Sequence, residues 1–127
     1  MIAPTYFYYF QYKTQYGLGE LSSGGRTDLG IAHGEDVFLI IPLSERKKIP
    51  FDDDETNLEF KFFDMYTKFS NNNLAEFGML EIAPVNGTTI NYMDILSPTQ
   101  FGMKVFKENY YGNQMFWDKE INFHLEN

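Results

Sequence analysis

The sequence predicts an α/β fold, because strand-like and helix-like patterns alternate along its 127 residues. Residues 5–12 form an aromatic run that follows a proline, which is typical of a buried strand. A helical pattern begins after the acidic residues 52–55, and a short strand is predicted at residues 79–82. There is no internal repeat and no evident linker, so residues 1–127 are predicted to form one segment.

The composition excludes several classes of function. A formal net charge of −8 argues against binding to nucleic acid, which requires a basic surface, and the basic cluster at residues 46–48 is short. The longest apolar run, residues 37–43, contains Pro42 and is far too short to span a membrane. The absence of cysteine excludes disulfides and thiolate zinc sites.

The aromatic content bears on whether the chain is a complete fold. Aromatic residues make up 18% of the chain, with 13 Phe and 9 Tyr. Burying so many rings requires an extensive partner surface. This composition fits a piece of a larger core better than a self-contained domain. An independent small binding protein is therefore the least favoured of the functions considered below.

The best-defined element is the helix that follows residues 52–55. Acidic residues favour a helix N-terminus because of the helix dipole, and the alternative of an EF-hand calcium loop lacks the required spacing. Thr56 and Glu59 have the spacing of a capping box. Residues 70–73 favour turns and are predicted to end the helix. One apolar face is predicted, consisting of Leu58, Phe62, Met65 and Phe69.

The remaining segments are less sharply defined. The glycine-rich residues 16–28 are predicted to be a loop, and residues 84–87 a turn. Ser97 and Pro98 are predicted to begin a last helical region, because proline suits the first helical position. His124 is distant from the other histidine, so we expect no metal site and no cofactor.

The most informative motif is Gly-Ile-Ala-His-Gly-Glu-Asp at residues 30–36, directly before the apolar residues 37–41. It places the imidazole of His33 on a loop bracketed by glycines, with a packed element after it and the predicted strand at residues 5–12 before it. A histidine on such a loop is well placed to act as a general base. The alternative interpretation is a solvated loop residue without a chemical role.

The order of strand, glycine-rich linker, Gly-x-x-His-x-Glu-Asp and apolar run resembles the catalytic-histidine region of type B carboxylesterases, insect carboxylesterases above all. These enzymes form the cholinesterase-like branch of the α/β-hydrolases. Residues 66–70 resemble the family's Trp-Thr-x-Phe-Ala segment, with Tyr66 in place of Trp, and residues 115–118 resemble its terminal Phe-Trp-Asp/Glu helix. Three asparagines at 71–73 replace its Gly-Asn-Pro turn.

This resemblance implies a partial α/β-hydrolase fold, in which residues 1–127 are the C-terminal part of a type B carboxylesterase domain. It further implies that His33 is the histidine of a Ser…Glu/Asp…His triad acting on a small-molecule ester. The family's serine elbow, triad acid and oxyanion hole lie upstream of the histidine. None of the five serines present lies in a Gly-x-Ser-x-Gly motif. We therefore expect this chain to be inactive by itself.

Further expectations depend on the same resemblance. A non-catalytic cholinesterase-like adhesion protein is the main alternative, because such proteins keep the fold and often the histidine. No signal peptide is recognised at the start, whereas full-length family members are commonly secreted. In that case Asn86, in the sequon Asn86-Gly87-Thr88, is a predicted N-glycosylation site. The strand at residues 5–12 would lack an upstream neighbour, so self-association through its free edge is expected.

Overall fold

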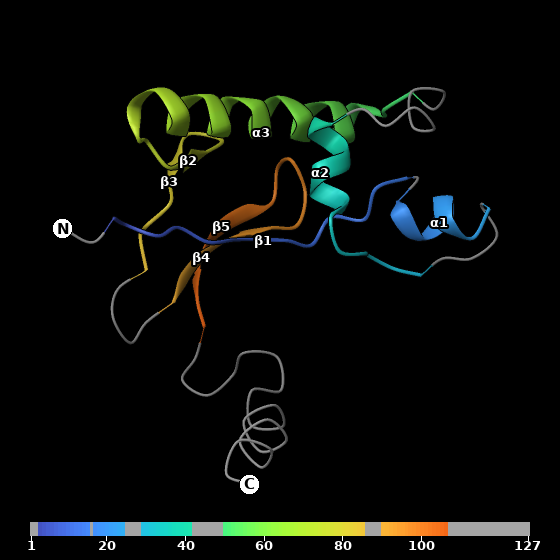
Figure 1. The fold of residues 1–127 in the computed structure, drawn as a ribbon, viewed down its shortest axis with the longest axis horizontal. Coiled ribbons are helices and arrows are strands. Elements are labelled where there is room, and N and C mark those ends of the chain that lie inside the picture. Colours follow the sequence, from blue (N-terminus) through green and yellow to red (C-terminus); the bar gives the residue numbers. More distant parts are fainter. Residues whose placement is uncertain (1–2, 16, 25–28, 42–49, 86–89, 107–127) are drawn as a thin grey trace, which may run out of the picture.

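The computed structural model describes residues 3–15, 17–24, 29–41, 50–85 and 90–106. The predicted combination of strands and helices is present, and Figure 1 shows α3 lying across a small sheet. The elements in chain order are β1 (Tyr8–Phe10), α1 (Leu18–Ser22), α2 (Glu35–Ile40), α3 (Asp53–Asn72), β2 (Glu76–Phe77), β3 (Leu80–Glu81), β4 (Asn91–Ile95) and β5 (Phe101–Val105).

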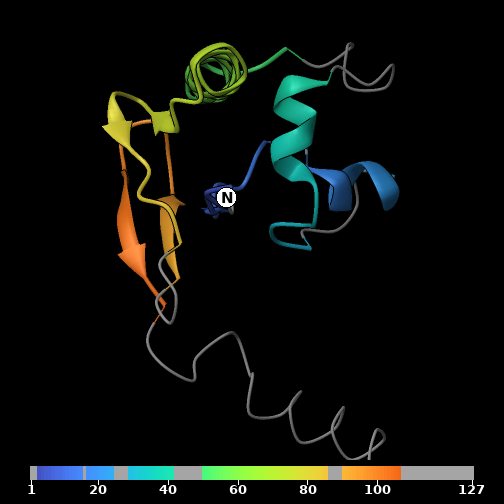
Figure 2. The same cartoon turned by 60° about the vertical axis from the view of Figure 1, so that its left-hand side comes forward.

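The main sheet is mixed and has the strand order β1-β4-β5. Strand β1 runs parallel to β4, and β5 returns antiparallel to β4 as the second strand of a hairpin. Figure 2 shows β1 between this hairpin and the helices α1 and α2. Within the described ranges β1 pairs with β4 alone, so it is an edge strand.

The side chains of β1 and its flanks alternate between two environments, as the two-residue period of a strand requires. Tyr6, Tyr8, Phe10 and Tyr12 pack against the core, whereas Phe7 and Tyr9 are 46% and 52% exposed. The prediction of a buried strand therefore holds for one face of β1 and is wrong for the other. The ladder is also shorter than the predicted residues 5–12, because only Tyr8–Phe10 pair with β4.

Helix α3 begins four residues earlier than its predicted capping box. The N-cap is Asp52, whose Oδ1 accepts the Glu55 N–H at 2.8 Å, and Glu55 Oε2 accepts the Asp52 N–H at 3.4 Å. Thr56 lies inside the helix instead, and its hydroxyl donates to the Asp52 carbonyl at 2.8 Å. The observed pair, Asp52 and Glu55, and the predicted pair, Thr56 and Glu59, have the same sequence spacing. Spacing alone therefore does not select between the two capping boxes. The helix ends as predicted among the asparagines, with Asn73 in the left-handed region.

Phe62 lies at the centre of the core, with no exposed surface. Its ring contacts those of Tyr8, Phe10 and Phe77 at centroid distances of 5.6, 5.8 and 5.2 Å. The predicted apolar face is confirmed for Leu58, Phe62 and Met65, which are buried. It is wrong for Phe69, which is 43% exposed and packs edge-on against the Tyr6 ring.

Two predicted segments have another conformation. Residues 16–28 include the short helix α1, which begins after Gly17, so they are not loop throughout. Ser97 and Pro98 lie in the β4–β5 connection and do not begin a helix. The Ser97 hydroxyl oxygen accepts the N–H groups of Thr99 and Gln100, at 3.3 and 2.9 Å. A serine that satisfies backbone donors locally favours a turn over a helix.

The predicted strand at residues 79–82 is the β3 strand of a small hairpin whose other strand, β2, was not predicted. The two connecting residues, Gly78 and Met79, both have positive φ, 56° and 69°. This conformation is typical of the tightest hairpin turns.

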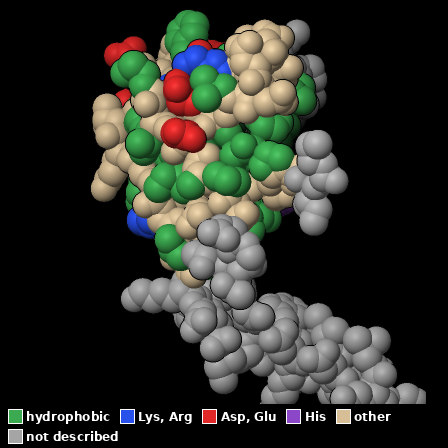
Figure 3. Space-filling model, turned by 90° about the vertical axis from the view of Figure 1, so that its left-hand side faces the viewer, with side chains coloured by type: hydrophobic (Ala, Val, Ile, Leu, Met, Phe, Trp, Pro, Cys, Tyr) green, Lys and Arg blue, Asp and Glu red, His purple; other side chains and the backbone are tan. Residues whose placement is uncertain are grey.

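Several predictions lie outside the described residues: the basic cluster at 46–48, the sequon at Asn86, the helix at 115–118 and His124. In the part of the chain that the structure does describe, no helix is long and apolar enough to cross a membrane. Figure 3 shows hydrophobic side chains across one face of the molecule. The exposed hydrophobic residues include Phe60, Phe63 and Met79.

The central position of Phe62 leads to a stability prediction. Phe62→Ala should lower the free energy of unfolding by about 3–5 kcal/mol, because it removes buried surface and leaves a cavity. Phe60→Ala is the matched control on the same helix, since Phe60 is 68% exposed, and should change it by about 0.5 kcal/mol or less. Urea unfolding in dilute solution measures both, and equal losses would contradict the central role of Phe62.

Candidate functional site

His33 lies on the turn that leads into α2, and its side chain is exposed. The turn is bracketed by Gly30 and Gly34, whose φ values of 74° and 83° lie in the left-handed region. Side-chain-bearing residues rarely adopt this conformation, which explains the glycines on either side of the histidine. The apolar run after the motif continues as α2, and Leu39 of this helix is buried in the core. The predicted loop followed by a packed element is therefore confirmed.

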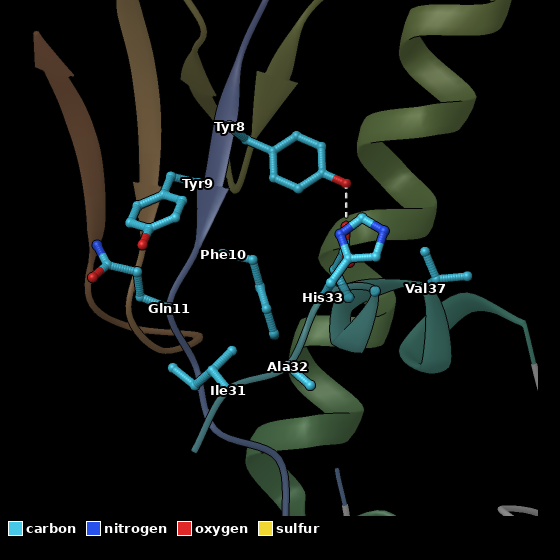
Figure 4. A pocket seen from close by; sticks show the side chains of 10 residues that line it. Tyr8, Tyr9, Phe10, Gln11, Ile31, Ala32, His33 and Val37 are labelled. Carbon is cyan, nitrogen blue, oxygen red and sulfur yellow. Dashed lines mark hydrogen bonds between the residues drawn. The ribbon is translucent and has the colours of Figure 1, made fainter. Parts of the chain in front are cut away.

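An open cavity of about 490 Å³ separates the His33 turn from β1. Figure 4 shows the side chains of His33 and Tyr8, both of which line this cavity. The cavity is lined by Tyr8, Tyr9, Phe10, Gln11, Ile31, Ala32, His33, Gly34, Asp36 and Val37. The predicted strand and the histidine motif, which are far apart in sequence, thus form two walls of one cavity.

Asp36 and two tyrosines form a hydrogen-bonded chain at this wall. The Tyr8 hydroxyl donates to Asp36 Oδ2, and the Tyr8 and Tyr66 hydroxyl oxygens lie 3.0 Å apart. Burial, and then the hydrogen bond to Asp36, raise the pKa of Tyr8 well above its ordinary value. Tyr8 therefore remains a neutral hydrogen-bond donor at physiological pH.

The sequence did not single out Tyr8 or Tyr66 as site residues. The alternation of β1 was an available signal, because it places Tyr8 and Phe10 on the same face of the strand. Nothing in the sequence paired Tyr8 with Asp36, since 28 residues separate them. The contact exists only because the turn before α2 folds back against β1.

Glu35, the other member of the acidic pair, has a different environment. Its side chain is 1% exposed. Its Oε1 accepts the Ala32 N–H at 3.0 Å, and its Oε2 accepts the Thr14 hydroxyl at 3.4 Å. The two neighbouring carboxylates thus hold the His33 turn from two sides, Asp36 through β1 and Glu35 through the segment that follows β1.

Two further buried carboxylates anchor the segment after β1. The Gln11 side-chain amide donates to Asp94 Oδ1, and the Gln15 N–H donates to Glu55 Oε1 at 2.7 Å. Tyr12 lies between Gln11 and Gln15 in the sequence. Its burial and the charges of the acidic residues around the start of α3 raise its pKa to about 12. This chain segment, which forms part of the support for the His33 turn, is therefore held by side chains from α2, α3 and β4.

The cavity lining includes an imidazole but no serine within the described ranges. The four described serines, Ser22, Ser23, Ser70 and Ser97, are all absent from the cavity lining, and Ser44 lies outside the described residues. In the same part of the chain, no three His, Asp or Glu side chains gather to form a metal site. Within the described residues, the cavity therefore has an imidazole in its lining but no serine hydroxyl that could form an acyl intermediate.

Comparisons with known proteins address the resemblance directly. No protein-family model matches the chain. The chain is 28% identical to a venom carboxylesterase-6 of the honeybee Apis mellifera over 117 residues. The matched region covers 91% of this chain and 20% of that protein. It is 25% identical over 119 residues to a carboxylic ester hydrolase of the bumblebee Bombus ignitus, covering 91% of this chain and 21% of that protein. The chain is therefore carboxylesterase-like, of the insect type that its histidine motif indicated, and spans about a fifth of the length of the curated relatives that it matches.

Proposed function

We propose that residues 1–127 are the C-terminal part of a type B carboxylesterase domain with a partial α/β-hydrolase fold, and that His33 is its catalytic base. One observation carries the proposal: an exposed imidazole, held on a turn at a cavity beside β1, in a chain similar to insect carboxylesterases over nine-tenths of its length. The names of both relatives favour an ester hydrolase over the adhesion-protein alternative.

In the intact enzyme, His33 would accept the proton of the serine hydroxyl as its oxygen attacks the ester carbonyl. The imidazolium would then donate this proton to the leaving alcohol, which gives an acyl-enzyme. Water would hydrolyse the acyl-enzyme by the same two proton transfers, and the free serine would be regenerated. A carboxylate from upstream would orient the ring throughout. If the intact protein is secreted, Asn86 is the predicted glycosylation site.

The first prediction concerns this chain alone. The purified 127-residue chain should not hydrolyse short aryl esters above background, because the serine and the oxyanion donors supply the main catalytic contributions. Release of the aryl alcohol measures this. Turnover that is lost on His33→Ala and survives repurification would contradict the proposal that the chain is an incomplete enzyme.

The second prediction concerns His33 in a complete enzyme. In a chimera that carries this chain in place of the matching fifth of the honeybee relative, His33→Ala should lower kcat by about 10⁴-fold or more, as loss of a triad member does. His124→Ala is the matched control, with kcat expected to stay within about twofold of the parent chimera. A loss of less than about tenfold on His33→Ala would assign the base to another residue.

The third prediction concerns self-association, which we propose occurs through the free edge of β1. The Phe7 carbonyl and the Gln11 N–H bond to β4, at 2.9 and 2.8 Å. In a parallel strand, the N–H and C=O groups of successive residues point to opposite edges. The backbone groups of Tyr8 and Phe10 therefore point to the other edge, which pairs with no strand among the described residues. Such an edge is a template for pairing with another chain.

Tyr9→Lys should shift the chain towards monomer, because a charged side chain on an exposed edge strand opposes pairing. Phe60→Lys is the control, since it places the same charge on exposed helix α3. Light scattering after gel filtration measures the mass of each variant. If Phe60→Lys restores the monomer and Tyr9→Lys does not, association occurs through the helix and the edge proposal is wrong.

A further inference from the structure

We infer that Glu35 is a positioning residue for His33, and that it acts through the main chain of the turn on which the imidazole lies. The inference rests on the proposed role of His33 as the base. Glu35 is two residues from the histidine in sequence, yet it is 1% exposed while His33 is exposed. The carboxylate therefore lies behind the turn, and the imidazole faces the cavity in front of it.

The anchor is a hydrogen bond to the residue directly before the histidine. Glu35 Oε1 accepts the Ala32 N–H at 3.0 Å, so the carboxylate holds the main chain one residue before His33. The Glu35 N–H in turn donates to the Ala32 carbonyl at 3.4 Å. Main chain and side chain of one residue thus close the turn around His33, and hydrogen bonds to a charged acceptor are among the stronger ones in proteins.

The second carboxylate oxygen connects the turn to another part of the fold. Glu35 Oε2 accepts the hydroxyl of Thr14, which is itself buried. Thr14 belongs to the segment that follows β1, and its neighbour Gln15 is held by Glu55 of α3. The His33 turn is therefore held in place by contacts that lead to β1 and α3, in addition to its own short helix α2.

The surroundings leave no room for a side chain opposite the carboxylate. A Cβ added at Gly17 would lie 2.8 Å from the carboxyl carbon of Glu35 and closer still to Oε1. The φ of Gly17 is −76°, which any residue can adopt, so this glycine is required for space and not for conformation. The pocket around the carboxylate is thus shaped by a third segment of the chain.

The turn depends on such an anchor because of its glycines. Gly30 and Gly34 flank the histidine segment, and glycine retains more conformational freedom than any other residue. Without the carboxylate, the Ala32 N–H would lose its side-chain acceptor, Glu35 Oε1. A catalytic group that is misplaced by about 1 Å can cost about 100-fold in rate.

Hydrogen exchange on the full 127-residue chain tests the anchor without any need for activity. Glu35→Ala should speed exchange of the Ala32 amide about tenfold, as expected for losing a hydrogen bond to a charged group. Gly17→Ala should do the same by displacing the carboxylate. Glu35→Gln should preserve protection, because its amide can accept from Ala32 and donate to Thr14. Glu81→Ala, which removes an exposed carboxylate on β3, should leave the Ala32 amide unchanged.

Kinetics in the chimera then separate positioning from simple stabilisation. Glu35→Ala should lower kcat per folded molecule by about 100-fold with KM changed by about twofold or less, and Glu35→Gln should recover most of the loss. Glu81→Ala, an exposed acidic residue on β3, is the control. Loss of folded protein alone would reduce the amount of active enzyme and leave kcat per folded molecule unchanged.

Three results would overturn the inference: unchanged exchange at Ala32 in Glu35→Ala, unchanged kcat per folded molecule in that variant, or a Glu35→Gln variant as impaired as the alanine variant. The proposed function fails differently, by the survival of activity in His33→Ala. The exchange measurement still judges the anchor if the chimera does not fold.

Discussion

The stretch of chain that leaves β1 is held by three buried carboxylates, each from a different element. Asp94 of β4 accepts from Gln11, Glu35 of α2 from Thr14, and Glu55 of α3 from Gln15. Burying a carboxylate is costly unless its oxygens are hydrogen-bonded. These contacts therefore favour this arrangement of sheet, turn and helix, because losing it would leave buried acceptors without the donors that they have here.

Apolar packing makes a complementary contribution to the same arrangement. Phe62 inserts between the rings of β1 and Phe77, and the alternation along β1 presents Tyr8 and Phe10 to it. Area burial supplies the larger share of the driving force, but it is not directional. The carboxylates supply the direction, since each hydrogen bond joins particular atoms. Together they fix β1 and the segment after it against α3, and the cavity forms beside them.

The site divides its tasks among neighbouring residues of one motif. His33 is exposed at the cavity, Glu35 is buried behind the turn, and Asp36 is bonded to Tyr8 on β1. Such a division suits a group that must exchange protons, because the ring stays accessible while its backbone is held. It also fits a chain that spans about a fifth of its relatives, since the turn is anchored by contacts that lie within that fifth.

The sequence by itself determined the strand at β1, the helix α3 and the histidine turn, because a strand, a helix and a glycine-bracketed loop each leave a local pattern. The family resemblance also came from local motifs, and the insect relatives confirm it. Spacing did not identify the start of α3, because Asp52 and Thr56 each have a glutamate three residues later. At Ser97, a local turn replaced the expected helix. Only the tertiary structure decided that β1 is buried on one side, that Tyr8 meets Asp36 and that Glu35 turns inward to Thr14. These contacts join residues 21 to 28 positions apart, and no local pattern records which distant donor a buried carboxylate will find.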